Sequence, residues 1–246
     1  MSDTQTGTTA APGSRRRRVW IGAGAAVAVL AVLAVLSVLG TSSGPGSTDG
    51  PAPGPAAAAA APGAPGDPLS LGSPTAPVTV VQFGDFQCTF CGAFARGVEP
   101  ALRAQYVDTG RVRFQWRDFA YLGPQSQTAA VAARAAGRQG KFWAYHDALY
   151  AAPRAVNSGA LSPGFLLDTA RRLGLAPARF QADLADPALA GQVQADRDAG
   201  SAAGVVGTPT FLINGKLLFG AQPLAVFQQN IDTALAGSGA GSGASR

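Results

Sequence analysis

The chain has 246 residues, of which 47% are hydrophobic, and a formal net charge of +5. This length and composition suit one folded domain with a buried core and appended segments. Arg15 to Arg18 supply four of the nineteen basic residues, and the remaining charges are spread along the sequence. A nucleic-acid-binding protein needs a concentrated basic surface to neutralise phosphates, so we predict no nucleic-acid partner.

The N-terminal segment predicts a membrane anchor. Residues 1–18 are mostly small and polar and end in the four arginines, so we expect a disordered cytoplasmic tail. Residues 19–39 form an uncharged apolar run that, as a helix, would be roughly 31 Å long, which matches the hydrocarbon core of a bilayer. Because the arginines flank only its N-terminal side, the positive-inside rule predicts a single-pass cell-membrane protein whose remaining domain is extracytoplasmic.

A cleaved signal sequence is the alternative interpretation of this run. The apolar region of such a signal is usually roughly 7 to 15 residues long, and the sequence Val38-Leu39-Gly40 is a poor cleavage site. Either interpretation exports the following domain.

Two segments flank the expected domain. Residues 40–68 consist mainly of Gly, Pro, Ser and Ala, cannot bury a core, and are predicted to be a linker. Residues 237–246 form a Gly/Ser/Ala tract that we expect to be a disordered tail. The folded domain is therefore predicted to cover residues 69–236.

The first half of this domain begins with a strand and a helix. Residues 78–83 are a β-branched run typical of a buried strand. Residues 90, 94, 98 and 102 are hydrophobic at helical spacing, which predicts a helix that buries Phe90 and turns Arg96, Glu99 and Arg103 towards solvent. Pro100 should kink or divide that helix, because proline lacks an N–H and clashes with the preceding turn. Residues 112–116 alternate as a second strand.

The second half contains a helical block, a hairpin and a final helix. Between residues 125 and 203 we expect helices and no strand; the helical segments are predicted at 128–136, 141–150, 163–173 and 187–203. Two strands at 210–213 and 217–219 are joined by Asn214-Gly215, a strong hairpin signal, and a helix is expected at 223–235. The order predicts an α/β fold with a mixed sheet interrupted by an inserted helical block.

The two cysteines of the chain lie as Cys88-Thr89-Phe90-Cys91, directly after the first strand and at the start of the first helix. A sulfur at a helix N-terminus faces free N–H groups and the positive end of the helix dipole, which lowers the pKa of Cys88 and makes it a nucleophile. Cys91, one turn further in, can attack a mixed disulfide at Cys88, close the Cys88–Cys91 disulfide and release the partner.

Three alternatives to a redox pair are weaker. A purely structural disulfide around so short a loop would contribute only roughly 2 kcal/mol. A structural zinc site needs about four ligands, and beyond the cysteines the chain offers one histidine, His146. Inert thiols are not expected to stay reduced as neighbours in an oxidising compartment. We therefore predict neither a metal nor a cofactor.

Three separated motifs give this sequence a family resemblance: residues 83–91 around the cysteines, residues 141–147 in the helical block, and residues 206–211 before the hairpin. Together they resemble the DsbA-like branch of the thioredoxin superfamily, particularly its membrane-anchored or exported bacterial members. The resemblance covers about residues 69–235 and implies a thioredoxin-like fold. It also implies that Pro209 is cis beside the dithiol and that the backbone of Thr208 binds substrate like an added strand.

Four residues near the cysteines are candidates for tuning them: Gln82, Phe86, Thr89 and Phe90. The best-known oxidant of the family has Pro-His where this chain has Thr89-Phe90, and related members often carry a buried Glu where this chain has Gln82. A glutamine can hydrogen-bond but cannot take up a proton at physiological pH. These departures leave the preferred direction of exchange open.

Three further features have a structural and a functional interpretation. His146 lies in an aromatic helical segment and is expected to be a packed, hydrogen-bonded residue rather than a catalyst. Asp85 could influence the thiols or could hold a turn. The aromatic residues at 114, 116, 119 and 121 are expected in the core, with the edge of a substrate groove as the alternative.

The predicted function is thiol-disulfide exchange with exported polypeptides through the Cys-Thr-Phe-Cys site. The predicted direction is oxidation of the polypeptide, with the mixed disulfide at Cys88 and Cys91 as the resolving thiol. The resemblance implies regeneration by a quinone-coupled membrane oxidase. The alternatives are an extracytoplasmic reductase or isomerase, and a tethered chaperone or binding module, which would not need the two cysteines.

Overall fold

The computed structural model describes Gly54, Ala64 and residues 66–241. The predicted cytoplasmic tail, the predicted membrane anchor and most of the predicted linker lie outside these residues. Within the described part of the chain, every helix is too short or too polar to span a bilayer.

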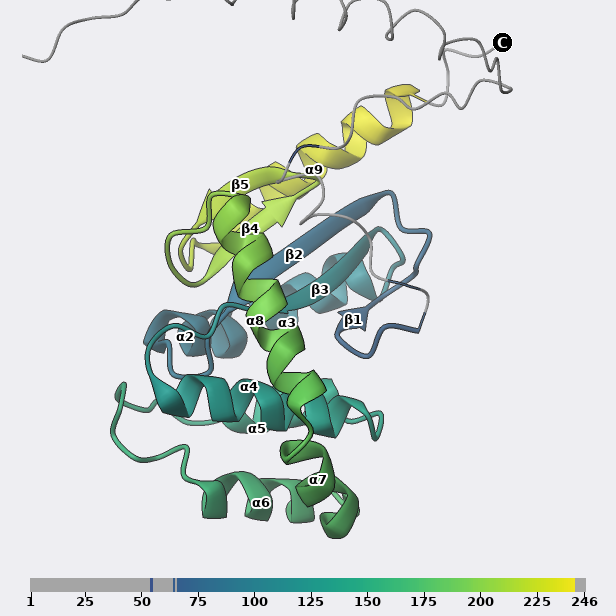
Figure 1. Ribbon diagram of the computed structural model, residues 1–246. Coiled ribbons are helices and arrows are strands. Elements are labelled where there is room, and N and C mark those ends of the chain that lie inside the picture. The colour runs from purple at the N-terminus through teal and green to yellow at the C-terminus, as the bar shows by residue number, and fades with distance from the viewer. Residues whose placement is uncertain (1–53, 55–63, 65, 242–246) are drawn as a thin grey trace, which may run out of the picture. The chain divides into compact units, whose positions relative to one another are not determined.

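Five strands form one mixed sheet in the order β1-β3-β2-β4-β5 (Figure 1). β2 and β3 run parallel, from the pair Val78 and Val112 to the pair Gly84 and Asp118, and the other neighbours are antiparallel. The strands are β1 Ser70–Leu71, β2 Val78–Gly84, β3 Val112–Asp118, β4 Thr210–Ile213 and β5 Lys216–Phe219. All seven residues of β2 are buried, as expected of a β-branched central strand covered on both faces.

The helices follow the predicted order. They are α2 Thr89–Gly97, α3 Glu99–Leu102, the π-helical turn η1 Arg103–Val107, α4 Pro124–Gly137, α5 Phe142–Tyr150, α6 Pro163–Arg172, α7 Pro177–Leu184, α8 Pro187–Ala202 and α9 Leu224–Gly241. The thioredoxin-like mixed sheet with an inserted helical block is therefore confirmed. The division at Pro100 is also confirmed, because α2 ends at Gly97 and this proline lies in the first turn of α3.

Three elements differ from the sequence-based expectations. The short strand β1 and the helix α7 were not predicted. The helix α9 continues to Gly241, so residues 237–241 are helical and not part of a disordered tail. Ser238 contributes to this extension, because its hydroxyl bonds to the carbonyl of Ala234 one turn earlier and to that of Pro77 at the start of the sheet.

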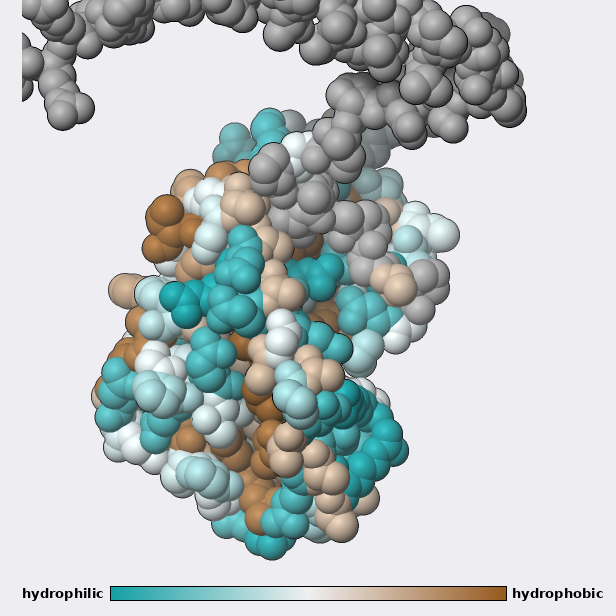
Figure 2. All heavy atoms as spheres, in the orientation of Figure 1, coloured by the Kyte–Doolittle hydropathy of each residue, from teal (hydrophilic) through white to brown (hydrophobic). Residues whose placement is uncertain are grey.

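The core has a sheet layer and a helical-block layer. On one face of the sheet, buried residues of β2, β3 and β4 pack against α2, η1 and α9. On the other face, Val81, Phe83 and Leu212 pack with Ala203 and Val205, at and just after the end of α8. The helical block has its own core of alanines, leucines and aromatic residues, and hydrophobic residues are visible between its polar surface residues (Figure 2).

Two predictions about the faces of α2 and α3 are wrong. Phe90, expected on the buried face, is 67% exposed, because the first turn of α2 lies beyond the sheet beside the dithiol. Glu99, expected in solvent, is buried. The interruption at Val98, whose backbone departs from ideal helix geometry, restarts the helix at Glu99 on a different face.

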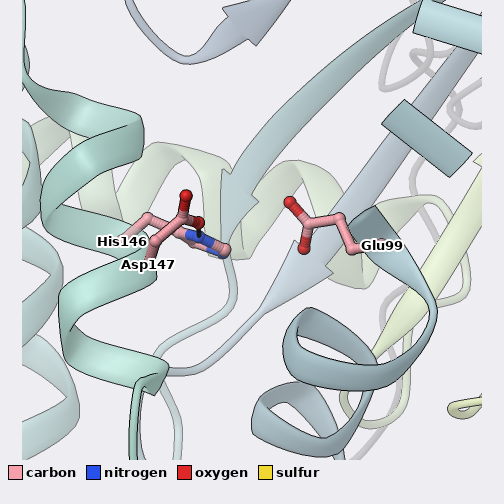
Figure 3. A group of neighbouring side chains, drawn as sticks. All are labelled: Glu99, His146 and Asp147. Carbon is pink, nitrogen blue, oxygen red and sulfur yellow. Dashed lines mark hydrogen bonds and ion pairs between the residues drawn. The ribbon is translucent and has the colours of Figure 1, made fainter. Parts of the chain in front are cut away.

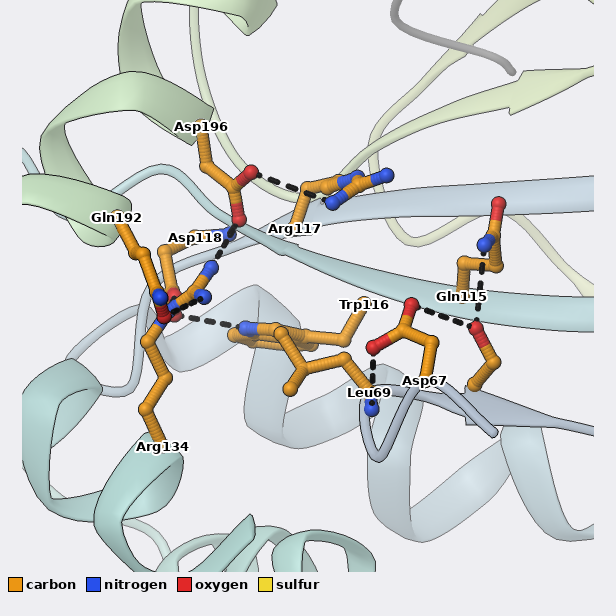
Figure 4. Close-up of polar contacts among 10 residues, drawn as sticks. Asp67, Leu69, Gln115, Trp116, Arg117, Asp118, Arg134, Gln192 and Asp196 are labelled. Atoms are coloured by element: carbon orange, nitrogen blue, oxygen red, sulfur yellow. Dashed lines mark hydrogen bonds and ion pairs between the residues drawn. The ribbon is translucent and has the colours of Figure 1, made fainter. Parts of the chain in front are cut away.

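An ion-pair network fastens the helical block to the sheet (Figure 4). Arg134 of α4 bonds Asp118 at the end of β3 through Nε at 2.5 Å, and it also pairs with Asp196 of α8. Asp196 in turn accepts the backbone N–H of Asp118 at 3.1 Å and lies 3.4 Å from Arg117. Because Asp118 also accepts the indole N–H of Trp116 at 2.8 Å, the network reaches the aromatic residues behind the cysteines.

Candidate active site

The start of α2 places both sulfurs at the C-terminal end of the parallel strand β2. Cys88 is the N-cap residue of the helix, with extended backbone angles, and its sulfur accepts the backbone N–H of Cys91 at 3.4 Å. Its own backbone N–H bonds to the carbonyl of Asp85 at 2.9 Å, which closes the turn between strand and helix. The cysteines are free thiols in the structure, so the disulfide between them stays a prediction.

Hydrogen bonds lower the pKa of Cys88 from an ordinary value of 9.0 to about 6. The bond from the thiol of Cys91 has the largest effect, and burial opposes it. Thr208 and the backbone N–H groups of Phe90 and Cys91 lower the pKa further. These N–H groups are free because they belong to the first turn of a helix, so the fold itself supplies donors to the thiolate.

The pKa of Cys91 is shifted in the opposite direction to that of Cys88. Its side chain is fully buried, and this burial, followed by the neighbouring Cys88, raises its pKa well above the ordinary value. Near neutral pH the pair therefore consists of one thiolate at Cys88, which is 7% exposed, and one buried thiol at Cys91. Because of this difference, Cys88 can react with a partner while Cys91 stays a protonated, buried thiol.

The loop before β4 lies against the dithiol. The peptide bond between Thr208 and Pro209 is cis, as the resemblance implied. The thiol of Cys88 donates to the carbonyl oxygen of Thr208 at 3.2 Å. The hydroxyl of Thr208 has no other hydrogen-bond partner among the described residues, so it is available to the thiolate of Cys88, whose pKa Thr208 lowers. The structure therefore brings together the four predicted residues Cys88, Cys91, Thr208 and Pro209.

The carboxylate of Asp85 accepts the hydrogen bonds that hold the loop before Cys88. This buried carboxylate accepts the backbone N–H of Gln87 at 2.8 Å and those of Tyr121 and Leu122 at 2.9 and 3.1 Å. It also accepts the hydroxyl of Ser126 at 2.7 Å. The turn-holding interpretation of this aspartate is thus the one that its contacts support, and the carboxylate ties the cysteine loop to the helical block.

Aromatic packing supports the loop from behind. Phe86 is buried and stacks on Trp116, with ring centroids 4.8 Å apart. Tyr150 packs against Phe86 and donates its hydroxyl to the carbonyl of Asp85 at 2.8 Å. Gly84 is required by this packing, because a Cβ there would lie 2.2 Å from the indole of Trp116. The sequence offered no signal for that close approach.

The other candidate tuning residues lie on different sides of the dithiol. Gln82 is fully buried in β2, and neither polar atom of its side chain has a hydrogen-bond partner among the described residues. Thr89 and Phe90 are exposed on the first turn of α2. Of the aromatic residues at 114, 116, 119 and 121, the first three are buried, while Tyr121 is 39% exposed, and its hydroxyl lies near Gly207 of the loop before Pro209.

His146 is a packed residue, as predicted. It is fully buried among aromatic rings, and its Nδ1 bonds to Asp147 at 2.8 Å. Glu99 faces these two side chains from α3 (Figure 3), and the three offer ligand atoms within 4.8 Å of one another. Arg103 already bridges Glu99 and Asp147, so a guanidinium supplies the positive charge that this group requires.

The comparisons with known proteins agree with this geometry. A family model described as Thioredoxin matches residues 65–233. The chain is a DsbA-like member of the thioredoxin superfamily. Disulfide bond formation protein D of Bacillus subtilis (strain 168) is 30% identical over 156 residues, which are 62% of this chain and 70% of that protein.

A solved structure has the same fold. The crystal structure of oxidised BdbD from Bacillus subtilis superposes with a TM-score of 0.65 at 28% identity, over 71% of this chain and 96% of that one. A second kind of relative is much longer: the Na(+)/H(+) antiporter NhaA 1 of Salinispora arenicola (strain CNS-205) is 40% identical over 165 residues. The match covers 66% of this chain and only 24% of the antiporter.

Proposed function

We propose that this DsbA-like protein is an extracytoplasmic thiol oxidant that transfers a disulfide to exported polypeptides. The observation that carries this proposal is the geometry of the dithiol. Cys88 caps the N-terminus of α2, where hydrogen bonds lower its pKa, and Cys91 is fully buried with a raised pKa. Stabilising the thiolate of the reduced form makes the disulfide form a stronger oxidant, because the reduced product is favoured. A tethered binding module would need no such pair.

The transfer has two steps. A substrate thiolate attacks Cys88 of the Cys88–Cys91 disulfide, which forms a mixed disulfide and releases Cys91 as the leaving thiolate, which takes up a proton. A second substrate thiolate then attacks the substrate sulfur of the mixed disulfide and expels Cys88. The substrate loses two electrons and two protons and gains a disulfide, and the protein becomes the dithiol. A quinone-coupled membrane oxidase would take up these two electrons and restore the protein disulfide.

The location of the protein is part of the proposal. Residues 19–39 would anchor it, with the N-terminus in the cytoplasm and the domain outside, supported by the apolar run and its four flanking arginines. Because the proposed oxidant carries a disulfide, intact cells of a bacterial host are first treated with a membrane-impermeant reductant. A membrane-impermeant thiol reagent is then expected to label Cys88. Labelling only after lysis would contradict the orientation.

Disulfide transfer to a reduced, unfolded protein tests the activity. The oxidised full-length protein should form disulfides in it stoichiometrically, and Cys88→Ala should abolish the transfer. Cys91→Ser should instead accumulate a mixed disulfide at Cys88 when it is offered a peptide disulfide, because the resolving thiol is missing. Unchanged transfer by Cys88→Ala would exclude the mechanism.

The reduction potential separates an oxidant from a reductase. Equilibration of the protein with glutathione buffers should give a value well above that of thioredoxin, which is roughly −270 mV. A value at or below the thioredoxin potential would contradict the oxidant role and favour the reductase.

A further inference from the structure

A small depression opens beside Cys88, between the first turns of α2 and the chain that leaves α5. Cys88 lines this depression together with two arginines, Arg96 from α2 and Arg154 from the loop after α5. The depression is shallow and too small for a cofactor. A group that docks at its mouth lies beside Cys88, which is one of the lining residues.

Backbone carbonyls hold the two guanidinium groups in place. Arg96 donates from Nη1 to the carbonyl of Tyr150 at 2.7 Å, and Arg154 donates from Nη1 to the carbonyls of Leu149 and Ala152. Arg154 is also stacked over the ring of Phe165, 4.6 Å from its centroid. Each arginine thus uses one nitrogen for anchoring, and the other donors of its planar fork make no hydrogen bond within the described residues.

These two arginines lack the partners that others in the fold have. Arg103 and Arg134 each pair with two carboxylates, but neither Arg96 nor Arg154 has a carboxylate within 4.0 Å in the described part of the chain. Burial and the charge of Arg96 lower the pKa of Arg154, so the two positive charges are close enough to interact. An anion placed between them would relieve this repulsion.

We propose that Arg96 and Arg154 form a subsite for a carboxylate that neighbours the reacting sulfur of the substrate. This inference rests on the proposed disulfide exchange and narrows its substrates. Guanidinium forks bind carboxylates through two parallel charge-assisted hydrogen bonds, which gives both attraction and orientation. The carboxylate can belong to an acidic residue next to the substrate cysteine or to a small anionic thiol.

The alternative role for Arg96 and Arg154 is to cap the C-terminus of α5, and it predicts a different effect of replacing them. The arginines also satisfy carbonyls at the C-terminus of α5, where positive charge is favourable. If capping were their whole role, replacing them would lower stability and would slow all substrates equally. A subsite instead changes the preference between an acidic substrate and its neutral counterpart, which capping cannot do.

The preference is measured with two peptides. Each contains two cysteines, and they differ only in a Glu or a Gln next to the first. We compare the rates at which the oxidised full-length protein oxidises them, each divided by the rate of the same peptide with oxidised glutathione to correct for thiol reactivity. The Glu peptide is expected to react about three- to tenfold faster, and 0.5 M salt should reduce this ratio.

Two variants show whether the preference comes from the depression. Arg96→Gln combined with Arg154→Gln should bring the ratio close to one. Arg111→Gln is the matched control, because Arg111 is exposed, stacks on Tyr106, has no carboxylate within 4.0 Å among the described residues, and precedes β3 at the opposite end of the sheet. This control should keep the full preference.

Further arms identify the source of the carboxylate and separate binding from chemistry. The reaction with 3-mercaptopropanoate, compared with 2-mercaptoethanol at equal thiolate concentration, reports whether small anionic thiols are favoured. Calorimetric binding of the two peptides with Ser in place of both Cys tests the subsite even if no disulfide is transferred, in which case the proposed function fails separately. Equal rates and equal binding of acidic and neutral partners, or a preference retained in the double variant, would overturn the subsite.

Discussion

At the scale of single residues, Cys88 depends for its acidity on donors that the fold places around it. The thiol of Cys91 and two N–H groups of the first helical turn act together with Thr208, and burial works against them. No histidine between the cysteines is required for this effect. The substitution of Thr89-Phe90 for the Pro-His of the best-known relative therefore does not remove the activation, although the sequence alone suggested a weaker one.

The pH dependence of stability follows from this pKa. Between pH 6 and 9 the folded reduced protein has lost a proton that the unfolded chain still carries, so the free energy of unfolding of the reduced form should rise with pH, by at most about 1.4 kcal/mol per unit. Above pH 9 the raised pKa of Cys91 should reverse the trend. The oxidised form has no thiol to titrate and is the control.

Urea unfolding of both redox forms at several pH values measures this effect. The difference in stability between the reduced and the oxidised protein should shift in favour of the reduced form as the pH rises from 6 to 8.5. A difference that stays constant over that range would mean that Cys88 titrates normally.

At the scale of elements, the strand-to-helix junction depends on a close contact between β2 and β3. Gly84→Ala would place a methyl group 2.2 Å from the fully buried Trp116, so we expect a loss of roughly 2 kcal/mol or more. Gly97→Ala is the matched control, because that helical position faces open space and alanine has the higher helix propensity, worth about 1 kcal/mol. Denaturant unfolding should show opposite signs for the two variants.

The junction also shows what the sequence could and could not predict. The β-branched run of β2, the position of Cys88 at a helix start and the Asn214-Gly215 hairpin are local signals, and the structure confirms them. Three of the partners of the Asp85 carboxylate, Tyr121, Leu122 and Ser126, lie 36 to 41 residues further along the chain, so no local pattern reveals them. The exposure of Phe90 was missed for a related reason: periodicity predicts a helical face but not where the covering layer ends.

At the scale of the whole molecule, the ion pairs of Arg134 connect the inserted block to the thioredoxin-like sheet. Arg134→Met would leave Asp118 and Asp196 with an unbalanced charge at a largely buried site, so we expect a loss of roughly 3 to 5 kcal/mol. Arg138→Met, at the C-cap of the same helix, removes two more exposed ion pairs and should cost about 1 kcal/mol or less.

A triple variant keeps this prediction testable if the single variant unfolds. Combining Arg134→Met with Asp118→Asn and Asp196→Asn removes the whole set of charges, so part of the lost stability should return. Melting curves of the three variants measure the effect, and a triple variant less stable than the single one would contradict the account of an unpaired charge.

The whole account depends on Cys88 being the activated sulfur and Cys91 the protected one. The rate at which iodoacetamide alkylates each cysteine of the reduced protein, followed by mass spectrometry as the pH is varied, tests this directly. Modification is expected at Cys88, with half of the maximal rate reached near pH 6, while Cys91 stays unmodified in the folded protein. A midpoint near pH 9, or alkylation of Cys91 first, would contradict it.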